Sequence, residues 1–302
     1  MPSKSKLSIF WLQGVSCNGN AHSFINYNNL EALLEKFEFY FHPILPSKYT
    51  LKEMATCKHK VDILLVEGCY NKTLQRGGES FGTLFAHYGT FAKHILAVGS
   101  CASFGGLLQQ SDAKNNSGLA YNKETKKANP VADMDKLINI PGCPIHPEWL
   151  GFVLEMLYYG KELLLDELQR PLELYAPLAH HGCDRNEYFE WKVDSKSFGT
   201  KEGCLFYEQG CRGPLTHSSC NKILWNDVNS KTRAGTPCFG CTEATFPTTN
   251  LFETKTNMSI PEEAPLGVSK RAYLTLTGIA KTFHIKRLEG KLIDYKKTHR
   301  KD

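Results

Sequence analysis

The amino-acid sequence predicts an α/β protein, with a doubly wound parallel sheet followed by an irregular, cysteine-rich domain. Two observations lead to this fold class. Short apolar runs alternate with segments of helical spacing through the first half of the chain, which is the pattern of strands joined by crossover helices. From about Leu172 onward the helical periodicity fades, while glycine, cysteine, threonine and aromatic residues become more frequent.

Four strands are expected, at 6–14, 61–68, 95–100 and 136–142. The run "VDILLVEG" at 61–68 is apolar almost throughout, as is typical of a strand buried on both faces of a parallel sheet. Each of the four runs has a glycine in one of its last two positions, where a strand ends and the chain turns.

Three helices are expected between or after these strands, at 22–40, 80–94 and 147–160. The last of them has proline at its start and glycine at its end, which are the residues favoured at those two places. The alternation indicates a flavodoxin-like arrangement in general form. The polar stretch at 109–130 interrupts it and is interpreted as a surface insertion.

We expect a domain boundary near residues 165–175, which gives a first domain of 1–170 and a second of 171–302. The second domain has too little apolar periodicity for a conventional core, so it needs cross-links such as metal centres. Its end, "KRLEGKLIDYKKTHRKD", is basic and is interpreted as a solvated tail. No motif for reading nucleic acid accompanies it, so no nucleic-acid partner is expected.

The cysteine content points to metal binding. The N-terminal apolar run is too short for a signal peptide, and no segment has the roughly 20 apolar residues of a membrane span. A cytoplasmic protein that is not itself membrane-spanning is therefore expected. Eleven cysteines are an odd number, and disulfides are rare in a reducing compartment. Thiolate metal ligation is the leading explanation.

Three of the cysteines, Cys17, Cys101 and Cys143, follow predicted strands. Since the carboxyl ends of parallel strands line one crevice, these thiols are expected to converge there. They could hold zinc or an iron–sulfur cluster, and three unrelated buried thiols is the alternative. A glycine-rich phosphate-binding motif is missing, and "GSCASFGG" at 99–106 matches such a motif only weakly. In "GVSCNGN", Asn20 stands where a Cys-x-x-Cys pair would have its second sulfur.

The second domain offers seven candidate ligands, and no single pair among them carries the signal. The Cys-x-x-Cys pair alone could be a redox or a zinc motif, and His181 is expected to be a neighbour of a ligand. Two closed zinc sites would need eight ligands, whereas four plus three suits one complete cubane cluster and one cluster that lacks a cysteine at one corner. The seven are His180, Cys183, Cys204, Cys211, Cys220, Cys238 and Cys241.

Several motifs resemble the small subunit of nickel–iron hydrogenases, from about residue 8 to residue 250. They are "WLQG…C", "VEG", "GSCASFGG", "IPGCPIHPEWL", "HGCDR", "GCRGP", "CN…W" and "PCFGCTEATFP". Within that family the chain is most similar to the cytosolic uptake and H2-sensing group, which lacks the export signal. The stretch "LGVSKRAYLTLTGIAKTF" also suits that group better than the periplasmic enzymes.

The resemblance implies three iron–sulfur clusters and a role for each candidate ligand. The proximal 4Fe–4S cluster would be bound by Cys17, Cys101 and Cys143, with Asn20 at the usual place of a fourth cysteine. The medial cluster, 3Fe–4S or 4Fe–4S, would be held by Cys220, Cys238 and Cys241. The distal 4Fe–4S cluster would be bound by His180, Cys183, Cys204 and Cys211. The nickel–iron centre would belong to a separate large subunit, so no catalytic residue is expected in this chain.

The function implied is electron transfer from H2 oxidation in the large subunit, through the clusters, to an external acceptor. The alternative is an H2-sensing subunit of a regulatory hydrogenase, whose output is contact with a signalling partner. In both cases the acceptor or partner is expected near the distal, His180 end. A third hypothesis, a zinc-stabilised binding module without a redox role, differs from these two in the identity of its metal.

Departures from the family pattern leave further residues to be interpreted. Cys69 follows "VEG" and could replace the ligand missing at Asn20, or be a plain buried thiol. Asn226 in "LWND" stands where many relatives have proline at the medial site. Glu67 could order the cluster loops or assist proton movement, and a carboxylate bonded to backbone N–H groups is the alternative. Cys57 is expected to be a bystander.

Overall fold

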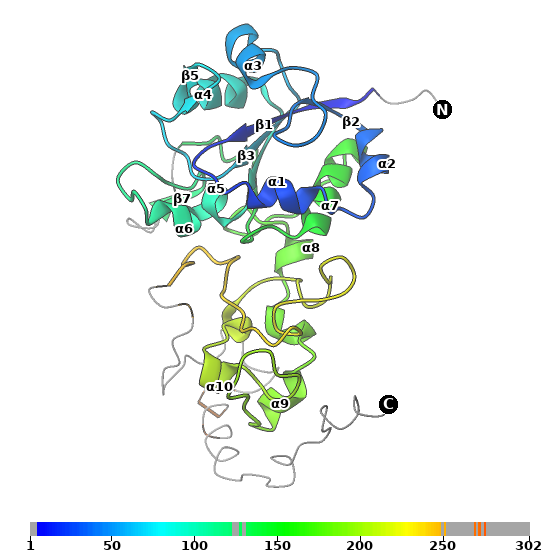
Figure 1. Ribbon diagram of the computed structural model, residues 1–302, viewed down its shortest axis with the longest axis vertical. Helices are drawn as coiled ribbons and strands as arrows, with labels where there is room; N and C mark the ends of the chain where they lie inside the picture. The colour runs from blue at the N-terminus through cyan, green and yellow to red at the C-terminus, as the bar shows by residue number, and fades with distance from the viewer. Residues whose placement is uncertain are drawn as a thin grey trace, which may run out of the picture.

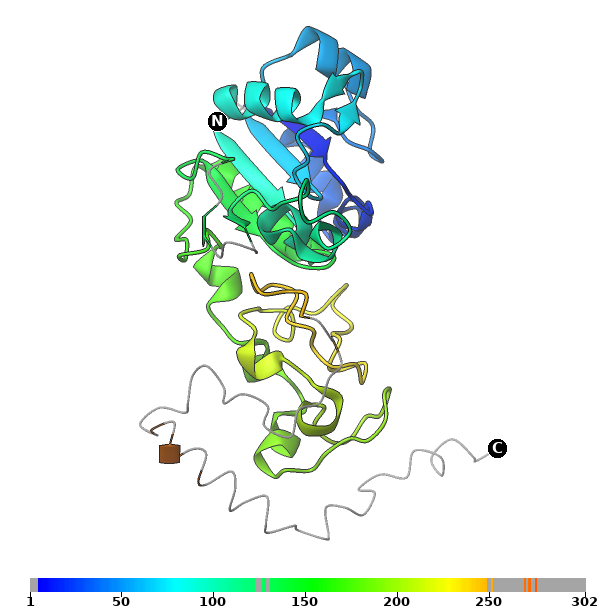
Figure 2. The same ribbon diagram turned by 90° about the vertical axis from the view of Figure 1, so that its left-hand side faces the viewer.

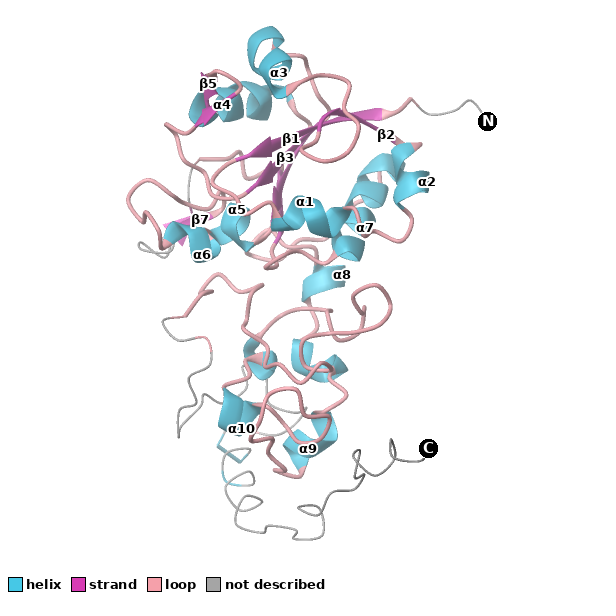
Figure 3. Cartoon of the chain, viewed as in Figure 1, coloured by secondary structure: helices cyan, strands magenta, loops and turns pink. Residues whose placement is uncertain are grey.

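The computed structural model describes residues 5–122, 127–128, 131–248, 251, 269, 271–272 and 275. The basic tail expected at 286–302 lies outside the described residues. A sheet domain and, below it, a region made mostly of loops follow one another along the chain (Figures 1 and 3). The mixed α/β fold class with a parallel central sheet is confirmed.

The central sheet has five parallel strands in the order β2-β1-β3-β6-β9. Numbered among themselves along the chain, these strands have the order 2-1-3-4-5, which is that of flavodoxin-like sheets. The four expected strands are all present, so the prediction of a doubly wound sheet is correct. The strands are β1 (Leu7–Gln13), β2 (Phe37–Phe41), β3 (Ile63–Glu67), β6 (His94–Val98) and β9 (Leu137–Ile140).

The prediction of one helix at 22–40 is wrong, because that segment contains two short helices and an edge strand. The helices are α1 (Gly19–Phe24) and α2 (Leu30–Leu34), and the strand is β2 with the sequence "FEFYF". Four aromatic residues in a run of five favour an extended chain, and every second side chain can then face the core. Phe37 and Phe39 do so, at 2% and 4% exposure.

Alternate residues of the strands form two apolar clusters, one on each face of the sheet. On one face, Ile9 and Trp11 of β1 pack with residues of α1, α2 and α7 (Pro147–Tyr159). On the other face, Phe10 and Leu12 pack with α3 (Leu51–Cys57) and α4 (Phe81–Phe91). None of the helices in the described part of the chain is long and apolar enough to cross a membrane.

Two expected helices occur close to their predicted bounds. The segment 80–94 gives α4, which Ser80 caps by accepting a hydrogen bond from the Thr83 backbone N–H. The segment 147–160 gives α7, with Pro147 in its first turn and Gly160 in the left-handed conformation after its end. Two short helices, α5 (Ser100–Phe104) and α6 (Gly106–Gln109), follow β6 at the carboxyl end of the sheet.

Two small antiparallel pairs lie outside the main sheet: β4 (Gln75–Arg76) with β5 (Glu79–Ser80), and β7 (Tyr121–Asn122) with β8 (Lys127–Ala128). The second pair belongs to the segment 109–130, which we interpret as an insertion. Residues 123–126 and 129–130 of that segment lie outside the described residues.

After α8 (Leu172–Tyr175), the chain forms the region below the sheet in both views (Figures 1 and 2). Its elements are short, and most of it is loop (Figure 3). Its apolar cluster has seven buried residues, of which three are cysteines, Cys204, Cys211 and Cys238. A cysteine-rich region follows the sheet, as expected. Its elements are η1 (Ala179–Gly182), α9 (Asn186–Glu190), α10 (Phe206–Gln209) and η2 (Gly213–Leu215).

Candidate metal centres

The carboxyl ends of the strands bring three predicted ligands to one end of the sheet. Cys17 lies between β1 and α1, Cys101 is the second residue of α5, and Cys143 follows β9. Cys17 is exposed, and the other two are partly buried. Burial raises the pKa of the Cys143 thiol to about 12, and the nearby thiols of Cys241, Cys101 and Cys17 add to the shift.

Glu67, at the end of β3, holds the Cys17 loop in place. Its carboxylate is fully buried and accepts hydrogen bonds from the Trp11 indole at 3.0 Å and the Gln13 amide at 3.0 Å. It also accepts from the backbone N–H groups of Asn20 at 3.0 Å and Ala21 at 3.3 Å, in the first turn of α1. The Glu67 carboxylate therefore orders this loop, in part by accepting hydrogen bonds from its backbone N–H groups.

Asn20 uses both ends of its side-chain amide on the backbone. Its Oδ1 accepts from the Ile145 N–H at 2.9 Å, and its Nδ2 donates to the Val98 carbonyl at 3.3 Å. The residue is 7% exposed. Its amide thereby links the end of β6 to the loop that carries Cys143.

Cys69 lies beside Cys101 at the same end of the sheet. It is fully buried, and its thiol donates to the Gly105 carbonyl at 3.0 Å. The hydrogen bond with Cys69 lowers the pKa of the Cys101 thiol to about 7, although burial opposes the shift. The same hydrogen bond, together with burial, raises the pKa of Cys69.

A cavity of about 480 Å³ lies beside these residues, where the sheet domain meets the C-terminal region. The three predicted medial ligands, Cys220, Cys238 and Cys241, line it together with Cys143. Burial raises the pKa of the Cys220 thiol to about 11 and that of Cys238 well above its ordinary value. Buried thiols around a roomy cavity fit an iron–sulfur cluster, which is held by cysteine sulfur.

The wall of this cavity on the sheet-domain side includes His146 and Trp149, at the start of α7. Both are almost fully buried, at 1% and 2% exposure. Burial lowers the pKa of His146 to about 4, so its imidazole is neutral at pH 7. The Lys231 ammonium lies 4.1 Å from the ring centroid of Phe239, and both residues also line the cavity.

A smaller cavity, of about 20 Å³, is lined by all four predicted distal ligands, His180, Cys183, Cys204 and Cys211. Burial lowers the pKa of His180 to about 4, and the neighbouring charges of His181 and Lys192 add to the shift. The imidazole is therefore neutral at pH 7, which is the form that binds metal. One neutral imidazole and three thiols form a donor set that fits a cluster with mixed ligands.

Aromatic rings and one buried lysine surround the distal group. The rings of His180 and Phe189 are edge-on at 4.5 Å between centroids. The Lys192 ammonium lies 4.3 Å from the centroid of Phe189, and the residue is 4% exposed. Lys192 Nζ donates to the Phe189 carbonyl at 3.0 Å, so its charge is held beside the His180 ring.

The predicted ligand groups adjoin one another in a series: the proximal group first, the medial group second and the distal group third. Cys143 of the first group and Cys241 of the second line the same cavity. The Cys238 N–H of the second group donates to the Cys211 sulfur of the third at 3.3 Å. The second group thus lies between the other two.

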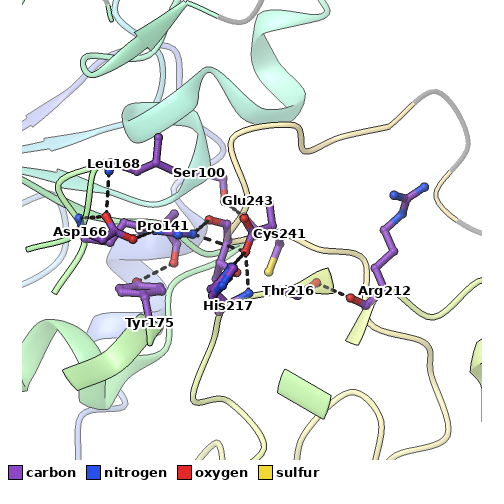
Figure 4. Close-up of polar contacts among 12 residues, drawn as sticks. Ser100, Pro141, Asp166, Leu168, Tyr175, Arg212, Thr216, His217, Cys241 and Glu243 are labelled. Atoms are coloured by element: carbon purple, nitrogen blue, oxygen red, sulfur yellow. Dashed lines mark hydrogen bonds and ion pairs between the residues drawn. The ribbon is translucent and has the colours of Figure 1, made fainter. Parts of the chain in front are cut away.

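A polar network joins Cys241 to the sheet domain (Figure 4). Ser100, the first residue of α5, donates a hydrogen bond to the Cys241 carbonyl and accepts one from the Gly142 N–H at 3.0 Å. The Arg170 guanidinium donates to the Thr242 carbonyl at 3.0 Å. The loop with Cys241 is thereby fixed against both loops that carry Cys101 and Cys143.

Arg170 is also the charged centre of this network. It is 4% exposed and pairs with Asp166 at 2.7 Å and with Glu243 at 3.4 Å. Glu243 also accepts from the His217 backbone N–H at 2.6 Å. The buried Arg170 therefore holds two partly buried carboxylates and a backbone loop together between the two parts of the chain.

Three other residues considered from the sequence have exposed side chains. Cys57 is exposed at the end of α3, His181 is exposed beside His180, and Asn226 is exposed and does not line the cavity of Cys220. Among the described residues, no three or more His, Cys, Asp or Glu side chains are grouped to hold a single metal ion. Sequence reasoning missed His146, Trp149 and the Arg170 network, although "IPGCPIHPEWL" contains the first two.

Two known families match successive parts of the chain. Residues 175–253 match the family described as the C-terminal part of the NiFe/NiFeSe hydrogenase small subunit, and residues 17–157 match NADH ubiquinone oxidoreductase, 20 Kd subunit. The uptake hydrogenase small subunit of Afipia carboxidovorans is 30% identical over 275 residues, covering 82% of this chain and 70% of the relative.

A second relative shares a shorter but more similar segment. The periplasmic [NiFe] hydrogenase small subunit of Solidesulfovibrio fructosivorans is 40% identical over 159 residues, which is 51% of this chain and 48% of the relative. The chain thus spans about half the length of that relative.

Among solved structures, the fold is similar to a chain of the actinobacterial-type NiFe-hydrogenase from Ralstonia eutropha H16. The TM-score is 0.71 at 20% identity, and the match covers 92% of this chain and 90% of the other. At this identity the likeness concerns the fold alone.

Proposed function

The chain belongs to the small-subunit family of nickel–iron hydrogenases, and from this membership we propose that it relays electrons for such an enzyme. In this proposal the nickel–iron centre lies in a large subunit, which oxidises H2. This chain conducts the electrons away from that centre to an external acceptor.

The observation that carries the proposal is the serial order of the three ligand groups. Cys143 and Cys241 line one cavity, and the Cys238 N–H donates to the Cys211 sulfur at 3.3 Å. A series of adjoining sites, running from one end of the sheet into the loop region, is what a relay requires. A chain that used metal only to hold its fold together would have no need for the sites to adjoin in series.

We assign the proximal cluster to Cys17, Cys101 and Cys143, the medial cluster to Cys220, Cys238 and Cys241, and the distal cluster to His180, Cys183, Cys204 and Cys211. Bound clusters would supply one-electron redox chemistry at each site. The chain's own residues hold the ligands in place. Glu67 and Asn20 fix the Cys17 loop, and Ser100 fixes the loop of Cys241.

The distal end is the proposed point of contact with the acceptor. His180 replaces a thiolate, which removes a negative charge and favours the reduced cluster. The buried cation of Lys192 beside the His180 ring acts in the same direction, because it also stabilises added negative charge.

The test is anaerobic purification of the chain with a co-expressed large subunit, followed by iron, sulfide and zinc analysis. Three clusters predict about 11–12 iron atoms per chain with matching sulfide. About 7–8 iron atoms would mean that the proximal site had not formed. Zinc without acid-labile sulfide would contradict the proposal and favour a binding module.

Two variants make the result specific to the assigned ligands. Cys220→Ser removes a medial ligand and should lower the iron content by one cluster. Cys57→Ser changes a thiol that is exposed on α3, remote from every ligand group, and should leave the iron content unchanged. Rapid H2 oxidation with an artificial acceptor would support a relay, whereas slow turnover with a stable signalling complex would favour the sensing alternative.

A further inference from the structure

A single charged side chain, that of Lys231, lines the cavity of about 480 Å³ that the predicted medial ligands share with Cys143. The other described residues around this cavity are cysteines, neutral polar or apolar residues, and His146, whose imidazole is neutral at pH 7. No carboxylate is among these described residues. The fixed charge at the medial site is therefore a positive one.

The surrounding loop holds Lys231 in place. Its neighbours Ser230 and Thr232 are buried, at 7% and 3% exposure, whereas Lys231 itself is exposed. The Lys231 carbonyl accepts a hydrogen bond from the Thr236 N–H at 2.9 Å. The Lys231 ammonium lies 4.1 Å from the ring centroid of Phe239, which stands inside the Cys-x-x-Cys pair of medial ligands. The backbone and the ring therefore keep this charge beside the medial ligands.

The Lys231 ammonium has no counter-ion in the described part of the chain, where it forms neither a hydrogen bond nor an ion pair. Its charge acts instead on three thiols of the neighbouring ligand groups, those of Cys143, Cys220 and Cys241. Burial raises the pKa of all three thiols, and the Lys231 charge opposes that shift at each of them. The Glu243 carboxylate acts in the opposite sense at Cys241, but it pairs with Arg170 at 3.4 Å.

We propose that the Lys231 charge raises the reduction potential of the medial cluster and so draws electrons onto it from the proximal cluster. This inference rests on the proposed function, since it needs a cluster at Cys220, Cys238 and Cys241. Three thiolate ligands give such a cluster a net negative charge, and one more electron increases it, so an unpaired cation nearby favours the reduced state. The step is a one-electron transfer between two clusters, and the ammonium keeps its protons throughout.

The first experiment removes the charge while keeping a long, unbranched side chain. Lys231→Met retains an apolar chain over the Phe239 ring, and Lys231→Arg retains the charge. The potential of the medial centre is measured by EPR-monitored redox titration of the complex with a co-expressed large subunit. In Lys231→Met, the ratio of reduced to oxidised medial centre at a fixed potential should fall about threefold, which is about 28 mV for one electron. Lys231→Arg should stay close to the wild-type value.

Salt separates an effect of charge from an effect of packing, because salt screens an exposed charge and does not change side-chain shape. The difference in medial potential between Lys231→Met and wild type should therefore shrink in about 1 M salt, where the Debye length is about 3 Å. A difference of the same size in high salt would overturn the inference, since it would come from the altered shape of the side chain.

Lys60→Met is the matched control. Lys60 is also exposed, and its ammonium also lies over an aromatic ring, 5.4 Å from the centroid of Phe91. It lines neither of the two cavities that contain predicted ligands, so its loss should leave the medial potential unchanged. The distal centre of each variant provides a reference within the same sample.

A second neutral variant, Lys231→Gln, keeps the inference testable if the methionine variant loses its cluster, and the same threefold decrease is expected. An unchanged medial potential in a neutral variant with full iron content would overturn the inference and leave the proposed function intact. Loss of the medial cluster from both neutral variants would also overturn it, because Lys231 would then be needed to assemble the site. Wild-type protein without iron or sulfide would overturn the proposed function itself.

Discussion

Asn20 stands where the family pattern leads one to expect a fourth proximal cysteine, and its side-chain amide joins two loops instead. Its oxygen accepts from Ile145 and its nitrogen donates to Val98. These two hydrogen bonds give Asn20 a structural role. An amide can make both bonds, whereas a thiol can replace neither with the same geometry.

Replacing this amide by a thiol should lower the proximal reduction potential. Asn20→Cys adds a thiolate ligand, and its negative charge disfavours the reduced state. Asn20→Ala is the matched control, because it loses the same two hydrogen bonds without adding sulfur. Both variants should lose about 2–4 kcal/mol of unfolding free energy, with a lower proximal potential only in the cysteine variant. An unchanged redox titration of Asn20→Cys would refute the prediction.

His42 predicts a dependence of stability on pH. It lies among Trp11, Phe24 and Phe39, and burial lowers its pKa from 6.5 to about 3. Below pH 6.5 the unfolded chain binds a proton that the folded chain does not. This part of the stability is therefore complete above pH 6.5 and is lost as the pH falls toward 3.

The variant His42→Asn tests this assignment. An asparagine oxygen can accept from the Ile44 and Leu45 N–H groups, as His42 Nδ1 does at 3.0 Å, but it does not titrate. We expect the variant to have a lower free energy of unfolding than wild type at pH 7.5. This difference should be smaller by about 1.4 kcal/mol at pH 5.5. Urea unfolding of both proteins at the two pH values measures this, and a constant deficit would show that His42 is not the group involved.

The turn from β6 to α5 places Cys101, and Gly99 makes that turn possible. Gly99 has φ of 88° and ψ of 161°, a conformation that is nearly restricted to glycine. A Cβ at this position would clash with the Asn20 side-chain amide. The strand end, the Asn20 amide and the Cys101 helix are therefore packed as one unit.

Gly99→Ala should destabilise the fold and also lower the iron content of the proximal site. Gly78, in the turn between β4 and β5, provides the control, since it has φ of 95° and nothing within 4 Å of an added Cβ. Both substitutions place a side chain on a backbone with positive φ, which costs about 1–3 kcal/mol. Only Gly99→Ala should also lower the iron per chain, measured after anaerobic purification. Equal iron content in the two variants would contradict this account.

The elements that the sequence predicts correctly are those with local signals. The bounds of α7 follow from Pro147 and Gly160, and β3 follows from an unbroken apolar run. The edge strand β2 falls inside a predicted helix because the apolar spacing of 22–40 suits a helix over most of its length. The run "FEFYF" prefers an extended chain once β1 is available beside it, and that is a tertiary effect.

At the scale of the whole molecule, Arg170 connects the two parts of the chain. Arg170→Met would leave the Asp166 and Glu243 carboxylates without their guanidinium partner and the Thr242 carbonyl without its donor. We expect a loss of about 2–3 kcal/mol in unfolding free energy, because two partly buried carboxylates lose their buried guanidinium partner.

The exposed pair of Arg233 and Asp184 supplies the comparison for this prediction. Its side chains are 45% and 44% exposed, and surface pairs of this kind contribute about 0–1 kcal/mol. Arg233→Met should therefore unfold at nearly the wild-type urea concentration. A similar loss in both variants would mean that burial at Arg170 has no special effect.

The sequence predicts the sheet and the grouping of the ligands, but not how the groups meet. Cys17, Cys101 and Cys143 could be placed together because parallel strands end at one edge. The contact of Cys238 with Cys211, and that of Ser100 with Cys241, depend on how loops pack across the two parts of the chain. The place of His146 and Trp149 beside a cavity was missed for the same reason, since that cavity is also lined by residues from 216 onward.

The small apolar cluster of the C-terminal region has a consequence for the amount of protein in the cell. Three of its seven buried residues are cysteines, so under the proposed function much of its cohesion would depend on metal binding. A newly made chain in an iron-starved cell would keep a folded sheet domain but leave this region open to proteases. The abundance of the protein would then follow the iron supply without any dedicated regulator.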